Sequence, residues 1–116
     1  DEKDYITPLD LARLASIALS NPTFASVVSA KDKKIKSLNG KSYNLSNLNK
    51  LLDIPGVNGV KTGFTEGAGG VLVTSRKLDN GQDLIFVVMQ SQDRFADSEI
   101  LLSYLNDNLN YVSFHP

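Results

Sequence analysis

The sequence predicts an α+β fold, in which an antiparallel β-meander with a peripheral hairpin packs against helices from the N- and C-terminal ends of the chain. Apolar residues near both ends recur every three or four positions, a period typical of amphipathic helices. The middle of the chain holds apolar runs separated by turns that contain glycine and asparagine, as in antiparallel sheets. The 116 residues, of which 41% are hydrophobic, suffice for one domain, so we treat 1–116 as a single unit.

The first helix is predicted to begin after Thr7 and to end near Leu19. Thr7 is a favoured N-cap residue, and the fixed φ angle of Pro8 suits the first helical position. The apolar residues of this helix form one stripe that must be covered: Leu11, Leu14, Ala15, Ala18 and Leu19. A second, shorter helix over about 22–29 is expected to bury three side chains, those of Phe24, Val27 and Val28.

The dipeptide Asn39-Gly40 predicts a β-hairpin, because both residues tolerate the positive φ angles of a type I′ turn. Lysines occur on both arms, which suits a hairpin at the edge of the fold. We interpret the lysine-rich run 31–36 as a solvated face of this hairpin. The alternative is a contact between these lysines and an anionic polymer or phospholipid.

Three strands are predicted to follow, after a helical turn at about 49–52. The first runs from about Gly59 to Thr65, the second over 71–76 and the third over 84–89. The last element is predicted to be a helix over about 95–112. Its apolar face would consist of Leu101, Tyr104, Leu105, Leu109 and Val112.

The third strand carries apolar side chains on both faces, although a meander would leave it at the edge of the sheet. Residues from Leu84 to Met89 include neither charge nor proline, the usual means by which proteins protect an exposed edge. We therefore hypothesise that further strands lie beside it, contributed by sequence outside this chain. A homodimer or a strand exchange through Leu84 to Met89 is the alternative.

Composition argues against several classes of function. A formal net charge of −1 offers no field that would attract nucleic acid, and no nucleic-acid partner is expected. The lack of Cys excludes thiolate chemistry, and no cofactor or metal motif is present. No stretch approaches the roughly 20 apolar residues of a membrane span. The charged first residues do not resemble a signal peptide, so the protein is cytosolic or its leader lies outside the chain.

The segment 61–69 combines the groups that bind an anionic ligand. Lys61 supplies a cation, Thr62 and Thr65 supply hydroxyls, and Gly63 leaves room for the backbone of a ligand. The triplet Lys-Thr-Gly is one signature of penicillin-binding proteins and class A β-lactamases, whose nucleophile lies in a Ser-x-x-Lys motif. No serine of this chain is followed three positions later by lysine.

The sequence resembles the serine D-alanyl-D-alanine carboxypeptidases, the low-molecular-weight penicillin-binding proteins. The segment 55–69 carries the resemblance, which extends to residues 47–52, to the apolar strands and to residues 94–102. The helix start at 7–12 also looks like that of the family, whereas Gly70 departs from the aromatic residue often found there. Nearly the whole chain matches, but only to the second half of the family's catalytic domain. The resemblance thus implies a partial β-lactamase/transpeptidase-like domain.

The resemblance also implies roles for individual residues. Lys61, Thr62 and Gly63 would form the catalytic triplet, in which the Lys61 cation tunes the serine centre and the substrate carboxylate. The backbone N–H that follows the triplet would belong to the oxyanion hole. Substrate-binding roles are implied for Phe64, Thr65 and Arg94.

The reaction implied by the resemblance is acyl transfer. A serine attacks the penultimate D-Ala carbonyl of a peptidoglycan stem peptide, terminal D-Ala leaves, and water hydrolyses the acyl-enzyme. β-Lactams would acylate the same serine, and the protein would act outside the cytoplasm, secreted or in the cell envelope. Because the serine and its lysine are absent, we predict that this chain alone is inactive. Two alternatives stay open: a non-catalytic module that binds wall peptides or a partner protein, and a split enzyme completed by a second polypeptide.

Overall fold

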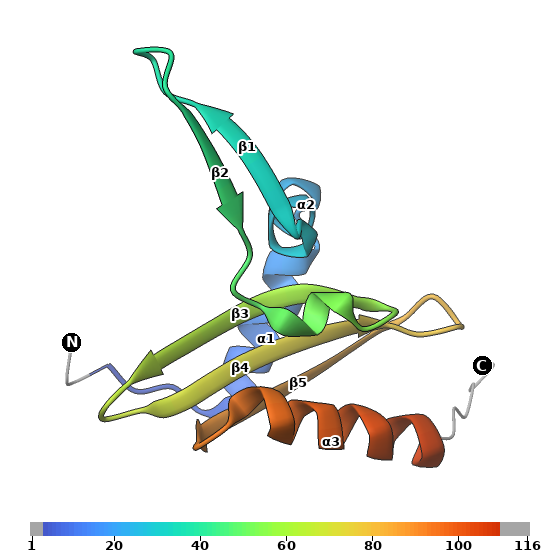
Figure 1. Cartoon of the computed structure of the whole chain (residues 1–116). Coiled ribbons are helices and arrows are strands. Elements are labelled where there is room, and N and C mark those ends of the chain that lie inside the picture. Colours follow the sequence, from blue (N-terminus) through green and yellow to red (C-terminus); the bar gives the residue numbers. More distant parts are fainter. Residues whose placement is uncertain (1–3, 110–116) are drawn as a thin grey trace.

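A three-stranded antiparallel sheet lies at the centre of the fold, with helices on both of its faces (Figure 1). The structure, a computed structural model, describes residues 4–109. Three strands form the sheet in the order β3 (Val57–Thr65), β4 (Gly69–Lys77) and β5 (Asp83–Ser91). Three helices surround it: α1 (Pro8–Leu19) and α2 (Pro22–Ser29) precede the sheet, and α3 (Arg94–Asn108) follows it.

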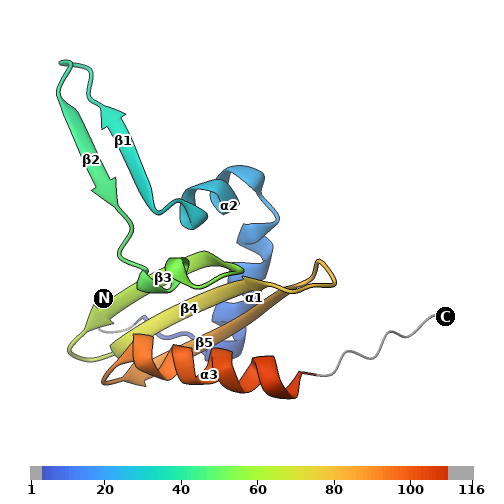
Figure 2. The ribbon, with the colours of Figure 1, turned by 45° about the vertical axis from the view of Figure 1, so that its right-hand side comes forward.

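Between α2 and β3 the chain forms a separate two-stranded hairpin and a short 3-10 helix. The hairpin consists of β1 (Asp32–Lys36) and β2 (Ser42–Ser46), and the 3-10 helix is η1 (Lys50–Asp53). The hairpin projects away from the central sheet in two views turned by 45° (Figure 1, Figure 2). The meander, the peripheral hairpin and the flanking helices confirm the predicted α+β class.

The two N-terminal helices begin where the sequence predicted. Thr7 caps α1, because its hydroxyl oxygen accepts a hydrogen bond from the backbone N–H of Asp10 at 3.1 Å. Asn21 caps α2 in the same way. Within the described residues, no single helix is long and apolar enough to cross a membrane; α1 and α2 pass that test only as a pair, which is bent by 109°.

The prediction that α2 buries three apolar side chains is wrong, since no residue of this helix is buried. Phe24 and Val27 are exposed, and Val28 is half-buried. Val28 approaches the sheet closely, because a Cβ atom placed on Gly59 of β3 would lie 3.1 Å from its Cγ2. The helix therefore packs against β3 at a glycine, and its opposite side faces outward.

The hairpin forms as predicted, but its turn is not of type I′. Gly40 has a φ angle of 83°, whereas Asn39 is not among the residues with positive φ. The backbone N–H of Gly40 donates to the carbonyl of Ser37 at 2.9 Å, so Leu38 and Asn39 are the central turn residues. The Asn39 side chain accepts hydrogen bonds from the Ser37 hydroxyl and from the backbone N–H of Lys41, which stabilises this geometry.

One apolar cluster packs on each face of the central sheet. On the α3 side the buried members are Leu51, Leu52, Val57, Leu72 and Leu102. On the α1 side they are Ala15, Val60 and Val73. Leu11 and Leu19 of α1 pack on this second cluster, as the predicted stripe requires, but Leu14 is exposed because it lies on the side of the helix away from the sheet.

The C-terminal helix is shorter than predicted and turns a different face to the sheet. It ends at Asn108, and Val112 lies outside the described residues. Leu102 is 3% exposed, whereas Leu101 is 37% exposed and Tyr104 is more exposed still. The buried side chains are Ser98 and Leu102, four positions apart, so this pair packs on the core. Of the predicted face, Leu105 and Leu109 are half-buried, whereas Leu101 and Tyr104 are exposed.

β5 occupies an edge of the sheet, as the meander predicted. Helices α1 and α3 cover its two faces, which accounts for side chains that are apolar on both sides. Among residues 4–109, no strand pairs with its outer edge. The hypothesis of additional strands from other sequence stays a prediction.

Candidate active site

The Lys-Thr-Gly triplet lies in the second half of β3, at the edge of the sheet opposite to β5. Thr62 pairs with Leu72, a member of the cluster under α3, so the Thr62 side chain points to the α3 side. Lys61 pairs with Val73 and points to the α1 side. In the described part of the chain no strand pairs with the outer edge of β3.

Thr62 and Arg94 lie in direct contact, although 32 positions separate them in the sequence. Arg94 Nε donates a hydrogen bond to Thr62 Oγ1 at 2.6 Å. Thr62 is 7% exposed, and the half-buried Arg94 guanidinium lies 4.8 Å from the centroid of the Phe95 ring. A planar cation beside a hydroxyl suits the recognition of a carboxylate. The structure thus brings these two predicted residues together.

The end of β5 determines where Arg94 lies. The register between β4 and β5 shifts after Gly70, so β5 carries a bulge at Met89 and Gln90. Gln90 has a φ angle of 55°, which is uncommon for a residue with a side chain. Bulges bend a strand and occur often beside active sites. Here the bend leads the chain directly into α3, whose first residue is Arg94.

Hydrogen bonds from short side chains fix the start of α3. The Asp93 carboxylate accepts from the backbone N–H groups of Phe95 and Ala96, both at 3.1 Å, and so caps the helix. The Ser91 hydroxyl donates to Oδ2 of Asp97 and links the end of β5 to the first turn. These bonds hold the backbone that carries Arg94.

Gly70 contributes to the site in a way that sequence reasoning missed. A Cβ atom at this position would lie 2.7 Å from the carbonyl oxygen of Ser91 and 3.3 Å from Cβ of Arg94. No side chain fits there, so the glycine permits the close approach of Arg94 to the sheet. The sequence indicated only that Gly70 departs from the aromatic residue often found at this position in the family.

Lys61 and Gly63 alternate with Thr62 along β3 and lie on the other face of the strand. Lys61 is exposed, and its Nζ donates to the backbone carbonyl of Thr62. A Cβ atom built on Gly63 would meet no described atom within 4 Å. A ligand backbone could therefore lie against this glycine without a steric clash.

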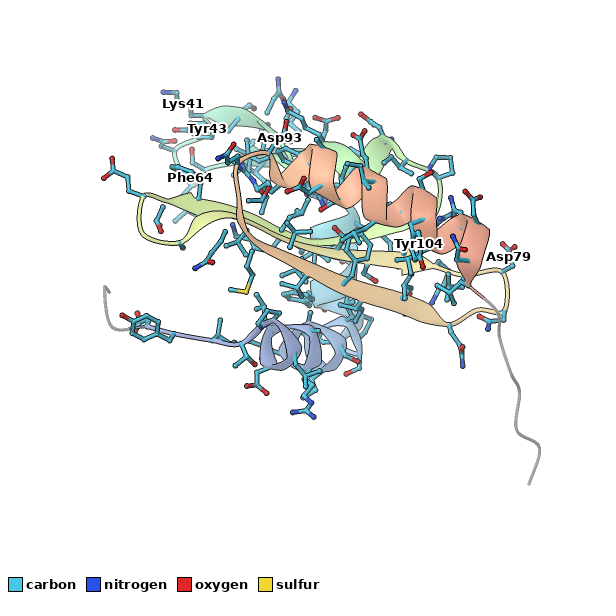
Figure 3. All side chains as sticks on the ribbon, turned by 90° about the horizontal axis from the view of Figure 1, so that it is seen from below. Lys41, Tyr43, Phe64, Asp79, Asp93 and Tyr104 are labelled. Carbon is cyan, nitrogen blue, oxygen red and sulfur yellow. The ribbon has the colours of Figure 1, made fainter. Side chains whose placement is uncertain are left out.

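The remaining predicted residues, Phe64 and Thr65, lie at the exposed end of β3. Figure 3 shows Phe64 and Asp93 at the same end of the molecule, opposite to Asp79 and Tyr104. The Thr65 hydroxyl oxygen accepts a hydrogen bond from the backbone N–H of Ala68 at 3.1 Å. This contact stabilises the β3–β4 turn, and Thr65 does not join the Thr62–Arg94 pair.

Two cavities of the described structure lie away from the triplet. One, of about 230 Å³, lies between the turn after β4 and the end of α3, where Arg76, Leu84 and Leu105 line it. The other, of about 370 Å³, lies at the base of the hairpin beside η1. Residues 4–109 hold no group of three or more His, Asp or Glu side chains that could bind a metal ion. Neither of these two cavities is lined by a residue of the triplet.

Residues 1–93 match the family model of D-alanyl-D-alanine carboxypeptidases. The chain belongs to this family. The match confirms the resemblance carried by the Lys-Thr-Gly segment. It ends one residue before Arg94, so the contact of Arg94 with Thr62 is seen in the structure and not in the family match. No curated protein matches the chain.

Solved structures of a DD-transpeptidase and of a penicillin-binding protein homologue share the fold of this chain. The Streptomyces K15 DD-transpeptidase superposes with a TM-score of 0.81 at 32% identity, covering 90% of this chain. A single-residue mutant of the same transpeptidase matches equally well. An evolved penicillin-binding protein homologue from Mycobacterium tuberculosis has a TM-score of 0.79 at 23% identity and covers 93% of the chain, which indicates a shared fold. The chain spans 43% of the length of each of these structures.

Proposed function

We propose that this chain supplies the substrate clamp of a serine D-alanyl-D-alanine carboxypeptidase that trims peptidoglycan stem peptides. The observation that supports this most directly is the hydrogen bond from Arg94 to Thr62 on an open edge strand. Together the two side chains offer one fixed positive charge and one hydroxyl, which suit the C-terminal carboxylate of a peptide. Lys61, at the adjacent position, places a second cation on the opposite face of β3.

The open edge of β3 supports binding of the peptide in an extended conformation. A peptide can add itself to a sheet edge through main-chain hydrogen bonds, and alternate side chains then give specificity. Gly63 has free space where a side chain would otherwise stand. We propose that the stem peptide lies along β3 at Gly63, and that Phe64 N–H stabilises the oxyanion.

The chemistry requires a nucleophilic serine in a Ser-x-x-Lys motif, and the sequence of this chain contains no such motif. The serine hydroxyl would attack the penultimate D-Ala carbonyl, its proton would pass to the departing amine, and terminal D-Ala would leave. Water would then cleave the ester and regenerate the hydroxyl. β-Lactams would acylate the same oxygen. Since peptidoglycan lies outside the cytoplasm, the complete enzyme would act there.

Exposed apolar side chains on α1 support the view that a further part of the fold covers this helix. Leu9, Leu14 and Ile17 are all exposed, although α1 packs on the sheet through its opposite side. Matched structures are more than twice as long as this chain, which covers 43% of them. We propose that the serine-bearing part of the enzyme covers this α1 surface.

The proposal can be tested by adding a polypeptide that carries the Ser-x-x-Lys half of a family member. The mixture should release D-Ala from a D-Ala-D-Ala peptide and form one covalent penicillin adduct, seen by mass spectrometry, on the added half. Thr62→Val should lower D-Ala release by about 10-fold to 100-fold, because a hydrogen bond to a charged group is lost. Thr23→Val, an exposed threonine on α2, is the control and should change nothing.

The outcomes separate this proposal from a binding module. A stoichiometric penicillin adduct on the 116-residue chain itself would overturn the assignment of the nucleophile to another polypeptide. Saturable binding of the D-Ala-D-Ala peptide by the chain alone, abolished by Lys61→Ala and unaccompanied by activity in the mixture, would favour a non-catalytic wall-peptide-binding module instead.

A further inference from the structure

The two strands of the β1–β2 hairpin carry all of their apolar side chains on one face. The strand register pairs Ile35 with Tyr43 and Lys33 with Leu45, so these four side chains share one face. The opposite face is entirely polar: Asp32, Lys34, Lys36, Ser42, Asn44 and Ser46. All residues of both strands are exposed, so the apolar face is not covered by the described part of the chain.

The tip of the hairpin presents a leucine surrounded by lysines. Leu38 is fully exposed at the turn. Lys36 precedes the turn and Lys41 follows it, and the Lys41 Nζ lies 5.4 Å from the centroid of the Tyr43 ring. An exposed leucine, an aromatic ring and flanking cations on one projecting element form an amphipathic end.

Positive charge is concentrated on this hairpin. Residues 32–46 contain four lysines and a single acidic residue, Asp32 at the base, while the formal net charge of the whole chain is −1. A ligand that complements this segment must therefore be anionic. The lysines alone would suit any polyanion. Binding is also favoured by burial of the Leu38 side chain, which a soluble polyanion does not provide because it leaves Leu38 exposed to water.

We propose that the β1–β2 hairpin docks on an anionic lipid bilayer, with Leu38 entering the interface while Lys36 and Lys41 contact lipid phosphates. Anionic bilayers attract basic segments, and apolar side chains at the interface add affinity. The hairpin projects away from the sheet that carries the triplet, so docking would leave β3 accessible (Figure 2). This inference does not depend on the acyl-transfer chemistry.

The test is sedimentation of the 116-residue chain with vesicles of phosphatidylglycerol and phosphatidylcholine or of phosphatidylcholine alone. We expect binding only to the anionic vesicles and weaker binding at high salt. The double variant K36S/K41S should bind on the order of 20-fold more weakly, since each lysine near an anionic surface contributes about fivefold. Leu38→Ser should weaken binding several-fold at unchanged charge.

Matched controls keep these effects specific. K50S/K77S removes the same charge outside the hairpin, and Leu48→Ser removes a leucine that is 79% exposed outside it. Both controls should bind like the unchanged protein. Because the chain has no tryptophan, Leu38→Trp would also report insertion directly through a blue shift of its fluorescence.

Two results would overturn the proposal. Equal binding, or no binding, to anionic and neutral vesicles would exclude an anionic lipid surface as the ligand. Binding that depends on the lysines but is unaffected by Leu38→Ser, and that soluble polyphosphate displaces fully, would assign the hairpin to soluble polyanions.

Discussion

At the scale of single residues, the position of Arg94 at the start of α3 depends on Gly70 in β4. Thr62 alone is an ordinary buried hydroxyl, and it gains a charged partner only because Gly70 lets Arg94 approach. Arginine offers planar N–H donors that lysine lacks, which is why this contact combines charge with direction. The site is therefore defined by Gly70 as much as by the triplet.

Gly70→Ala should destabilise the chain and displace Arg94 from Thr62. Its Cβ would lie 2.7 Å from a backbone oxygen, so the neighbouring strand must shift. We expect a loss of about 1–3 kcal/mol in the free energy of unfolding, the usual cost of overpacking, measured by urea denaturation.

Gly63→Ala is the matched control for this effect, because its Cβ would meet no described atom within 4 Å. Its unfolding free energy should change by less than about 0.5 kcal/mol. Both variants should weaken ligand binding, Gly63→Ala because the added methyl group lies on the proposed peptide path and Gly70→Ala because Arg94 is displaced from Thr62. Equal stability of the two variants would contradict the role of Gly70.

At the scale of elements, local sequence signals located helices and strands well but did not reveal which faces pack. Caps at Thr7 and Asn21 act over one turn, so the sequence shows them directly. Burial depends on distant elements: α2 lies at the margin of the sheet, and α3 is rotated so that Leu102 faces η1. The contact between Thr62 and Arg94 is likewise set by a bulge with no signature in the sequence.

The rotation of α3 can be measured with two adjacent leucines. Leu102→Ala should cost about 2–5 kcal/mol of unfolding free energy, as for a large buried side chain. Leu101→Ala should cost less than about 1 kcal/mol, because Leu101 is 37% exposed. Both variants carry the same chemical change on the same helix, so each controls for the other. If chemical denaturation shows a larger loss of unfolding free energy for Leu101→Ala than for Leu102→Ala, the helix packs through the face predicted from the sequence.

At the scale of the whole molecule, the two outer strands of the sheet differ in character, and within residues 4–109 neither has a strand on its outer side. The β3 edge includes Lys61 and Thr65, and it suits the reversible binding of a polar peptide. The β5 edge between Leu84 and Met89 is apolar and uncharged, which favours stable pairing with another strand. The two edges therefore predict different partners for one sheet.

We expect the isolated chain to pair with a second copy through β5, and that contact to disappear when the serine-bearing part is added. Analytical ultracentrifugation should detect a concentration-dependent dimer. Hydrogen exchange should become slower at amides between Leu84 and Met89 as the dimer forms, because strand pairing supplies hydrogen bonds to backbone groups that are otherwise open. Amides of β3 serve as the internal control and should not change. A chain that stays monomeric at high concentration would contradict pairing through β5. A dimer that protects the amides of β3 would also contradict it, because the apolar strand β5 would then associate no more readily than the polar strand β3.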